Sequence, residues 1–205
     1  VGAAMVLLTG SDEDFSSRYR ARSCGTNVYG ARHALCRFGI HAAQRAGYFG
    51  IIFRRTVPAI TMGGGLWEES KALYPIMGAK PNISTHEWRF PNGSMIQFRS
   101  MQYEDDALAY QGAQLAEFCF EESTHFSASQ FWYLYSRLRT KCGMKARAFA
   151  TCNPDPDSWV RHLIDWYIGE DGFVVPGRGN VKRWFIRDGD ELIWGESADV
   201  VRRKA

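Results

Sequence analysis

Two adjacent carboxylates, Glu121 and Glu122, end a short and mostly apolar run of this sequence. The run covers residues 115–120, reads Leu-Ala-Glu-Phe-Cys-Phe, and is long enough to form a buried strand. At the tip of such a strand, one carboxylate can hold a hydrated magnesium ion while its neighbour polarises a water for attack on phosphorus. The pair therefore indicates a site for phosphoryl transfer.

Two other interpretations of the pair stay open from the residues alone. The carboxylates can form a solvated strand end that has no chemical role. Glu121 and His125, four positions apart, can instead be metal ligands on one helical turn. No other His or Cys nearby completes a plausible metal site, so the sequence favours this last interpretation least.

A nucleotide site also needs a loop whose backbone amides hold phosphates, usually with the pattern GxxxxGK[ST]. The chain has no lysine in its first 70 residues. Its closest match is the GxxxxG spacing from Gly25 to Gly30, followed by Ala31 and Arg32 where Lys and Ser or Thr would stand. The spacing precedes a predicted helix over residues 31–46, which is where a phosphate loop belongs.

Short polar residues follow a second predicted strand, over residues 146–150. Thr151, Cys152 and Asn153 stand before Pro154. Hydroxyl and amide groups at a strand tip can sense a γ-phosphate. The alternative is an ordinary Asn-Pro turn, which the residues alone favour.

The remaining patterns predict an α/β fold with a central sheet, flanking helices and short antiparallel additions. Residues 11–30 contain few large apolar groups and several arginines, and we expect an exposed, irregular excursion there. The other predicted strands cover residues 4–9, 50–54, 87–90, 95–98, 181–186 and 192–194, and the other predicted helices begin near residues 66, 127 and 158.

The composition suits one sizeable domain, because 45% of the 205 residues are hydrophobic. The net charge of +3 permits contact with nucleic acid without demonstrating it. No apolar run is long enough to span a membrane, and no signal-peptide pattern opens the chain. The five cysteines form no CxxC pair, so we expect free thiols in a reducing cytoplasm.

Several stretches together resemble one family, the large terminase subunits of tailed bacteriophages. The similarity extends over about residues 47–194, plus the first strand. It is carried, in order, by residues 53–56 (Phe-Arg-Arg-Thr), 64–70, 110–114, 121–126 (Glu-Glu-Ser-Thr-His-Phe), 130–134, 137–139 and 150–159 (Ala-Thr-Cys-Asn-Pro-Asp-Pro-Asp-Ser-Trp).

The resemblance implies a RecA-like P-loop NTPase core with a mainly parallel sheet, as a single ATPase domain over residues 1–205. The family's nuclease domain is expected to be absent from this chain. The implied activity is ATP hydrolysis, with ATP and Mg²⁺ as cofactors, coupled to translocation of double-stranded viral DNA into a capsid. The implied partners are the portal protein, the small terminase subunit and further copies in a ring, in the cytoplasm of a bacterial host.

Carried onto this chain, the resemblance makes Glu121 the magnesium ligand and Glu122 the catalytic glutamate. Residues 151–153 match the segment that couples hydrolysis to movement. Three features depart from the family: Glu121 stands where Asp is usual, Glu117 puts a charge inside an apolar strand, and the phosphate-loop lysine is missing. Residues 11–33 resemble nothing in the family. Two interpretations of this segment stay open: a frameshifted or decayed segment, or a genuine insertion in which Arg32 is the substitute cation.

Three functions therefore remain in view. The first is the ATPase domain of a packaging motor, impaired by the missing lysine. The second is a non-hydrolysing remnant or assembly module with the same fold. The third is another DNA translocase or helicase-type ATPase, which the resemblance fits less specifically.

Overall fold

The computed structural model describes residues 3–11, 14–24, 27–153, 155–171, 173, 175–178, 181–189 and 191–204. Its strands are β1 (Ala3–Ser11), β2 (Asp14–Cys24), β3 (Phe49–Arg54), β4 (Lys80–Asn82), β5 (Glu87–Arg89), β6 (Met95–Ser100), β7 (Glu117–Glu121), β8 (Arg147–Cys152), β9 (Lys182–Asp188) and β10 (Glu191–Gly195). Its α-helices are α1 (Asn27–Gln44), α2 (Val57–Thr61), α3 (Leu66–Leu73), α4 (Ala128–Tyr135), α5 (Val160–Ile164) and α6 (Ala198–Lys204). Short 3-10 helices are η1 (Pro75–Met77), η2 (Glu104–Tyr110), η3 (Ser123–His125) and η4 (Asp165–Tyr167).

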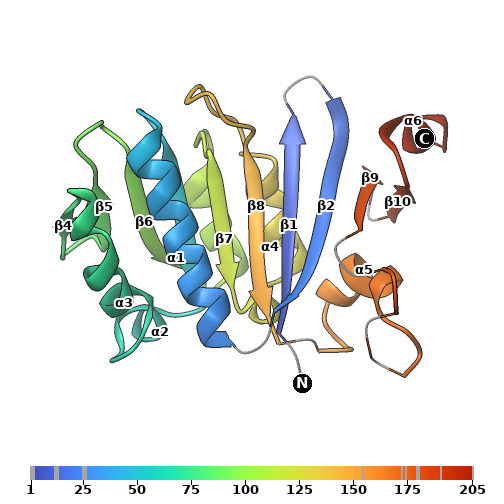
Figure 1. Ribbon diagram of the computed structural model, residues 1–205, viewed down its shortest axis with the longest axis horizontal. Coiled ribbons are helices and arrows are strands. Elements are labelled where there is room, and N and C mark those ends of the chain that lie inside the picture. The colour runs from blue at the N-terminus through green and yellow to red at the C-terminus, as the bar shows by residue number, and fades with distance from the viewer. Residues whose placement is uncertain are drawn as a thin grey trace.

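The described strands form one sheet in the order β10-β9-β2-β1-β8-β7-β3-β6-β5-β4 (Figure 1). The four strands β8, β7, β3 and β6 pair in parallel. The strands on either side of them pair antiparallel. The parallel part is therefore narrower than the mainly parallel sheet that we expected.

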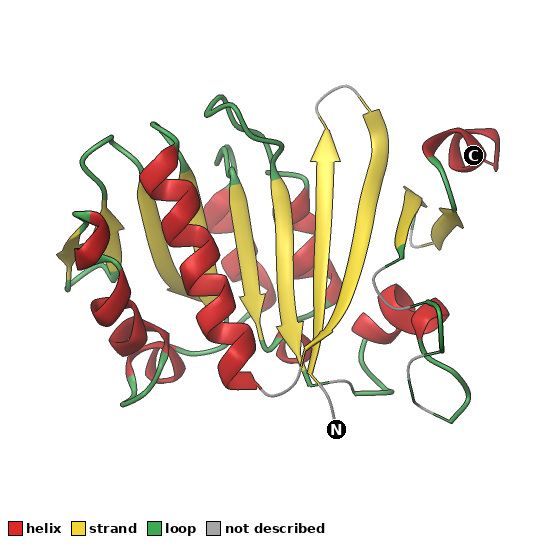
Figure 2. Cartoon of the chain, viewed as in Figure 1, coloured by secondary structure: helices red, strands yellow, loops and turns green. Residues whose placement is uncertain are grey.

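Helices cover both faces of the parallel strands, which gives three layers (Figure 2). Successive side chains of a strand point to opposite faces, so each strand contributes to two cores. On β7, Phe118 and Phe120 pack in the core that contains α4 and α5, whereas Cys119 packs in the core under α1 and α3. None of the helices in the described part of the chain is long and apolar enough to cross a membrane.

Most of the predicted elements are present, with shifted ends. The hairpins β5–β6 and β9–β10 form as expected. Ser127 accepts a hydrogen bond from the Gln130 backbone N–H, and the Gln130 side chain reaches back to the Ser127 N–H, which completes the predicted capping box. The four cysteines whose side chains are described are free thiols, as predicted.

The prediction of an irregular excursion over residues 11–30 is wrong. Residues 14–24 form β2, which lies inside the sheet between β1 and β9. The sequence holds a signal that we overlooked, since Arg18, Arg20 and Arg22 alternate with Tyr19 and other uncharged residues. Alternation with a period of two is typical of a strand with one polar face.

One further expectation near the N-terminus, the start of the helix predicted over residues 31–46, also needs correction. β1 runs antiparallel to β8 and turns back into β2, so it is not a member of the parallel set. β2 lies antiparallel to β1 and therefore runs in the same direction as β8, and it leads toward α1. α1 begins at Asn27, four residues before the predicted start. Residues 27–30 contain no proline, so their sequence permits this earlier start.

Glu117 is fully buried in β7 and faces α1. Arg37 Nε donates a hydrogen bond to it at 2.7 Å, and His41 Nδ1 lies 2.7 Å from its other oxygen. The Tyr48 hydroxyl also donates to this carboxylate, at 3.1 Å. Burial favours the neutral acid, but the His41 hydrogen bond and the charge of Arg37 outweigh burial and lower the pKa of Glu117. The charge that departs from the family pattern thus has three partners.

Replacing Glu117 with Gln should destabilise the fold strongly, because Arg37 would keep its buried position without an opposite charge. We expect a loss of about 3 kcal/mol in the free energy of unfolding, measured by urea denaturation. The matched control is Glu68→Gln, which removes the same charge from an exposed ion pair with Lys71. That control should cost less than about 0.5 kcal/mol. Equal effects of the two substitutions would contradict a structural role for the Glu117 network.

Candidate active site at the carboxyl edge of the sheet

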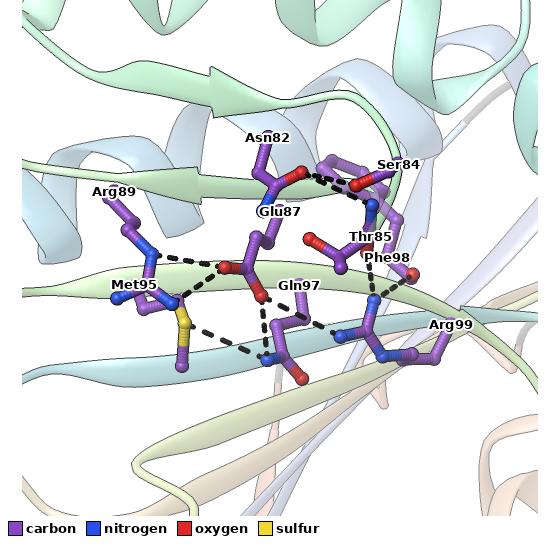
Figure 3. A network of polar contacts seen from close by, with 9 residues as sticks. All are labelled: Asn82, Ser84, Thr85, Glu87, Arg89, Met95, Gln97, Phe98 and Arg99. Atoms are coloured by element: carbon purple, nitrogen blue, oxygen red, sulfur yellow. Dashed lines mark hydrogen bonds and ion pairs between the residues drawn. The ribbon is translucent and has the colours of Figure 1, made fainter.

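Three buried glutamates lie in the described part of the sheet, and their surroundings differ. Glu87 on β5 is held by several donors, as Figure 3 shows. Arg89 Nε and Nη2 donate to it at 3.0 and 2.7 Å, Gln97 Nε2 donates at 3.2 Å, and Arg99 Nη2 lies 3.7 Å away. Glu87 and Glu117 thus each have several partners, which suits structural roles. Glu121 is the exception.

Glu121 is the last residue of β7 and is 3% exposed, which excludes a solvated strand end. It pairs in register with Thr151 on β8. The two residues come two positions after Cys119 and Phe149, which pack under α1, so they lie on the same face of the sheet. On the other side of β7, Arg54 follows Phe53, which pairs with Phe120. Arg54, Glu121 and Thr151 therefore form a row across the carboxyl ends of three parallel strands, on the face covered by α1.

Arg54 is the cation of this row. Its Nε forms an ion pair with Glu121, and its Nη1 lies 3.7 Å from Glu122 Oε1. The neighbouring Arg55 points elsewhere, because its Nη1 lies 3.3 Å from both the Met101 carbonyl oxygen and Gln130 Oε1. One guanidinium thus connects the two carboxylates.

The ion pair does not compensate fully for the burial of Glu121. Burial raises the pKa of Glu121 to about 7, against the opposing charge of Arg54 and with a further increase from Glu122. Glu117 on the same strand has its pKa shifted in the opposite direction. A carboxylate that titrates near neutral pH at a strand end is typical of functional sites.

Glu122 has a left-handed backbone conformation, with φ 59° and ψ 60°. For a residue with a side chain this conformation costs about 1 kcal/mol or more, and such residues cluster at functional sites. Glu122 is the residue directly before η3, and its Oε2 lies 3.5 Å from His125 Nε2. Glu121 and His125 do not share a helical turn, so the alternative metal site that pairs them is wrong.

Thr151 lies beside the carboxylates, because it pairs in register with Glu121 and contacts the backbone of Glu122. Thr151 is buried, and its Oγ1 accepts a hydrogen bond from the Glu122 backbone N–H at 3.4 Å. Thr151 lies within β8, whereas the sequence predicted that it would follow the strand. Asn153 is exposed and comes directly after β8. The Ser123 hydroxyl, next to Glu122, is fully buried and has no hydrogen-bond partner among the described residues. Several oxygen atoms therefore gather at one point of the edge.

The start of α1 lies at the same edge. Figure 1 shows the first turn of α1 at the end of the sheet toward which β7 and β8 point. His33 stacks on Phe149 of β8, with 6.0 Å between the ring centroids, so the preceding helical residues extend past Phe149 toward Thr151. The carboxyl ends of parallel strands and the start of a helix together form the usual place for phosphate groups in α/β folds.

The predicted phosphate loop differs from the structure. Gly25 lies outside the described residues, whereas Gly30 and Ala31 are helical residues of α1. Arg32, which is exposed, donates to Glu69 of α3 at 2.9 Å and does not contact the carboxylate pair. The cation that contacts the carboxylate pair is instead Arg54, at the end of β3, which the sequence alone does not single out. The one sequence feature that could have indicated Arg54 is its position at the end of the strand predicted over residues 50–54.

The residues at this edge fit a magnesium ion. Mg²⁺ prefers carboxylate and hydroxyl oxygens, and it is usually held by one or two carboxylates together with substrate phosphates. Glu121, Glu122 and Thr151 supply oxygens of these kinds. The described ranges contain no group of three or more His, Cys, Asp or Glu side chains that could hold a metal ion, so the two glutamates would complete the coordination with other oxygen ligands.

One comparison identifies a family. The profile described as terminase large subunit, T4likevirus-type, N-terminal, matches residues 21–200. No curated protein and no solved structure matches the chain. The match covers most of the sequence, including every strand from β3 to β10 and the carboxylate pair. It also covers residues 21–33, so the expectation that residues 11–33 resemble nothing in the family is wrong for that part. This chain therefore belongs to the terminase large subunit family and corresponds to its T4likevirus-type N-terminal region.

Proposed function

We propose that this chain is the ATPase domain of a phage DNA-packaging terminase, in which ATP hydrolysis drives translocation of viral DNA into the capsid. Membership of the terminase large subunit family supports a role in DNA packaging. The observation that carries the finer proposal is the row of Arg54, Glu121 and Thr151, with Glu122 directly after it, at the edge where α1 begins.

In this proposal the nucleotide phosphates lie against the start of α1, where backbone N–H groups and the helix dipole favour anions. Residues 25–32 supply those N–H groups, and Arg32 reaches the phosphates only by leaving Glu69. Glu121 and the phosphates hold Mg²⁺, which neutralises charge on the transferred phosphoryl group. Glu122 orients and polarises the attacking water, while Thr151 and Asn153 contact the γ-phosphate.

The partners follow from the family in the same way. They are double-stranded viral DNA, the portal protein, the small terminase subunit and further copies of the chain in a ring. The proposed place of action is the cytoplasm of a bacterial host. The RecA-like P-loop class of the core is also part of the proposal, because the described residues show an α/β sheet with helices on both faces and no phosphate loop.

A non-hydrolysing module with the same fold is the second candidate, and one observation favours it. The chain has no lysine before Lys71, and Gly30 and Ala31 are already part of a helix. A helical backbone cannot curl around a phosphate as a glycine-rich loop does. In that case the domain keeps its fold and its assembly surfaces without turning over ATP.

Replacing Glu121 with Gln should change how stability depends on pH in the metal-free chain. The raised pKa means that the folded chain holds this proton more tightly than the unfolded chain. The resulting stability is complete below the ordinary pKa of 4.5 and is lost as the pH rises through about 7. Relative to Glu121→Gln, the unchanged chain should therefore lose about 1–3 kcal/mol of unfolding free energy across this range.

Urea denaturation at several pH values, in the presence of a chelator, measures this difference. The control is again Glu68→Gln, whose carboxylate is exposed and should not alter the profile. Parallel profiles for the unchanged chain and Glu121→Gln would contradict the raised pKa of Glu121.

The missing lysine predicts slow hydrolysis, because the loss of one preorganised charge-stabilising group typically costs about 10²–10³ in rate. Substituting Ala31→Lys together with Arg32→Thr should raise turnover. Adding Glu122→Gln to this variant should abolish the gain, whereas adding Glu68→Gln should preserve it. Steady-state phosphate release with Mg²⁺ and ATP measures all four chains.

Two outcomes would count against the proposed mechanism. Fast turnover by the unchanged chain that survives Glu122→Gln would exclude Glu122 as the residue that orients the water. No gain on restoring the lysine would favour the non-hydrolysing candidate, because residues 27–30 would then remain helical and unable to hold phosphates.

A further inference from the structure

Arg54 has an unusual position for a structural cation. It is the last residue of β3, and its side chain is 21% exposed. It pairs with two carboxylates at the end of the neighbouring strand β7. Glu117, by contrast, has Arg37, His41 and Tyr48 as partners, which together hold one carboxylate. At the strand tip one guanidinium contacts two glutamates, and Glu122 also lies 3.5 Å from His125 Nε2.

The charges at the tip limit what can bind there. Two carboxylates and one guanidinium leave a negative balance, which favours a further cation. A divalent ion bound to the same oxygens would stand within a few ångströms of the guanidinium, where two like charges repel each other strongly in a partly buried site. Because the guanidinium lies against Glu121 Oε2 and Glu122 Oε1, a metal ion that binds these oxygens has to compete with Arg54 for them.

We propose that Arg54 is a positioning residue that competes with magnesium for the Glu121–Glu122 pair and releases both carboxylates when the metal ion binds. The inference rests on the proposed nucleotide site. It assigns Arg54 two tasks in the metal-free chain: to neutralise the buried Glu121, and to hold Glu122 in a fixed orientation.

The neighbouring residue supplies a matched control. Arg55 stands at the next position and carries the same charge, but its guanidinium hydrogen-bonds to Gln130 and to the Met101 carbonyl. Competition at the carboxylate pair should therefore respond to Arg54 and not to Arg55. A general effect of net charge on metal binding would appear in both variants.

The test measures Mn²⁺ binding without nucleotide, by electron paramagnetic resonance of the free ion, in the same buffer and at the same pH for every chain. Arg54→Gln should bind Mn²⁺ about tenfold more tightly than the unchanged chain, because a competing positive charge is lost. Arg55→Gln should stay within about twofold of the unchanged chain. Equal or weaker Mn²⁺ binding by Arg54→Gln would overturn the proposal.

A second variant covers the case in which Arg54→Gln does not fold. Arg54→Lys keeps the charge but replaces the planar, forked guanidinium with a compact ammonium that cannot reach both carboxylates. It should bind Mn²⁺ more tightly than the unchanged chain, and equal or weaker binding would again overturn the proposal. Circular dichroism shows whether each variant is folded.

This test and the test of the proposed function can fail independently. The proposed function is tested by measuring ATP binding in the presence of Mg²⁺. If the unchanged chain binds ATP and Arg54→Gln leaves Mn²⁺ affinity unaltered, the competition is wrong and the nucleotide site stands. If Arg54→Gln tightens Mn²⁺ binding and no chain binds ATP, the competition is correct and the nucleotide site is wrong.

Discussion

The burial of acidic side chains on β7 is the constraint on which the rest of the structure depends. Glu117 and Glu121 point from a strand covered on both faces toward α1, where an unpaired carboxylate would be costly. Arg37 and His41 of α1 meet the first of them. α1 is therefore fixed on the sheet by a buried ion pair as well as by apolar packing. Its start is thereby held at the carboxyl edge of β7 and β8.

The two glutamates show how one strand can carry a structural and an available carboxylate. Glu117 has enough donors to remain ionised, and its pKa is lowered. Glu121 has one cation, which it shares with Glu122, and its pKa is raised to about 7. The family match includes this strand and both carboxylates. The positive φ of Glu122 adds a strained backbone at the same point.

The sequence predicted those features that depend on short-range patterns. The apolar run before Glu121 corresponds to β7, and the predicted Ser127–Gln130 capping box lies at the start of α4. It did not predict partners that are distant in sequence, such as Arg37 for Glu117 or Arg54 for Glu121, because only the order of the strands brings them together. β2 was missed because its arginines suggested exposure, although their alternation is that of a strand. The phosphate-loop residues stay a prediction: Gly30 and Ala31 are helical residues of α1, Gly25 lies outside the described residues, and a GxxxxG spacing carries too little information to distinguish a loop from a helix.

The central claim is that the edge formed by Glu121, Glu122, Thr151 and the start of α1 holds a metal–nucleotide complex. A crystal structure of the chain grown with Mn²⁺ and a non-hydrolysable ATP analogue tests it most directly, because the anomalous scattering of manganese locates the metal independently. The account predicts an anomalous peak beside Glu121, with phosphates at the start of α1 and Arg54 withdrawn from the carboxylates. A peak elsewhere, or an edge without metal and with Arg54 still paired to both glutamates, would contradict it.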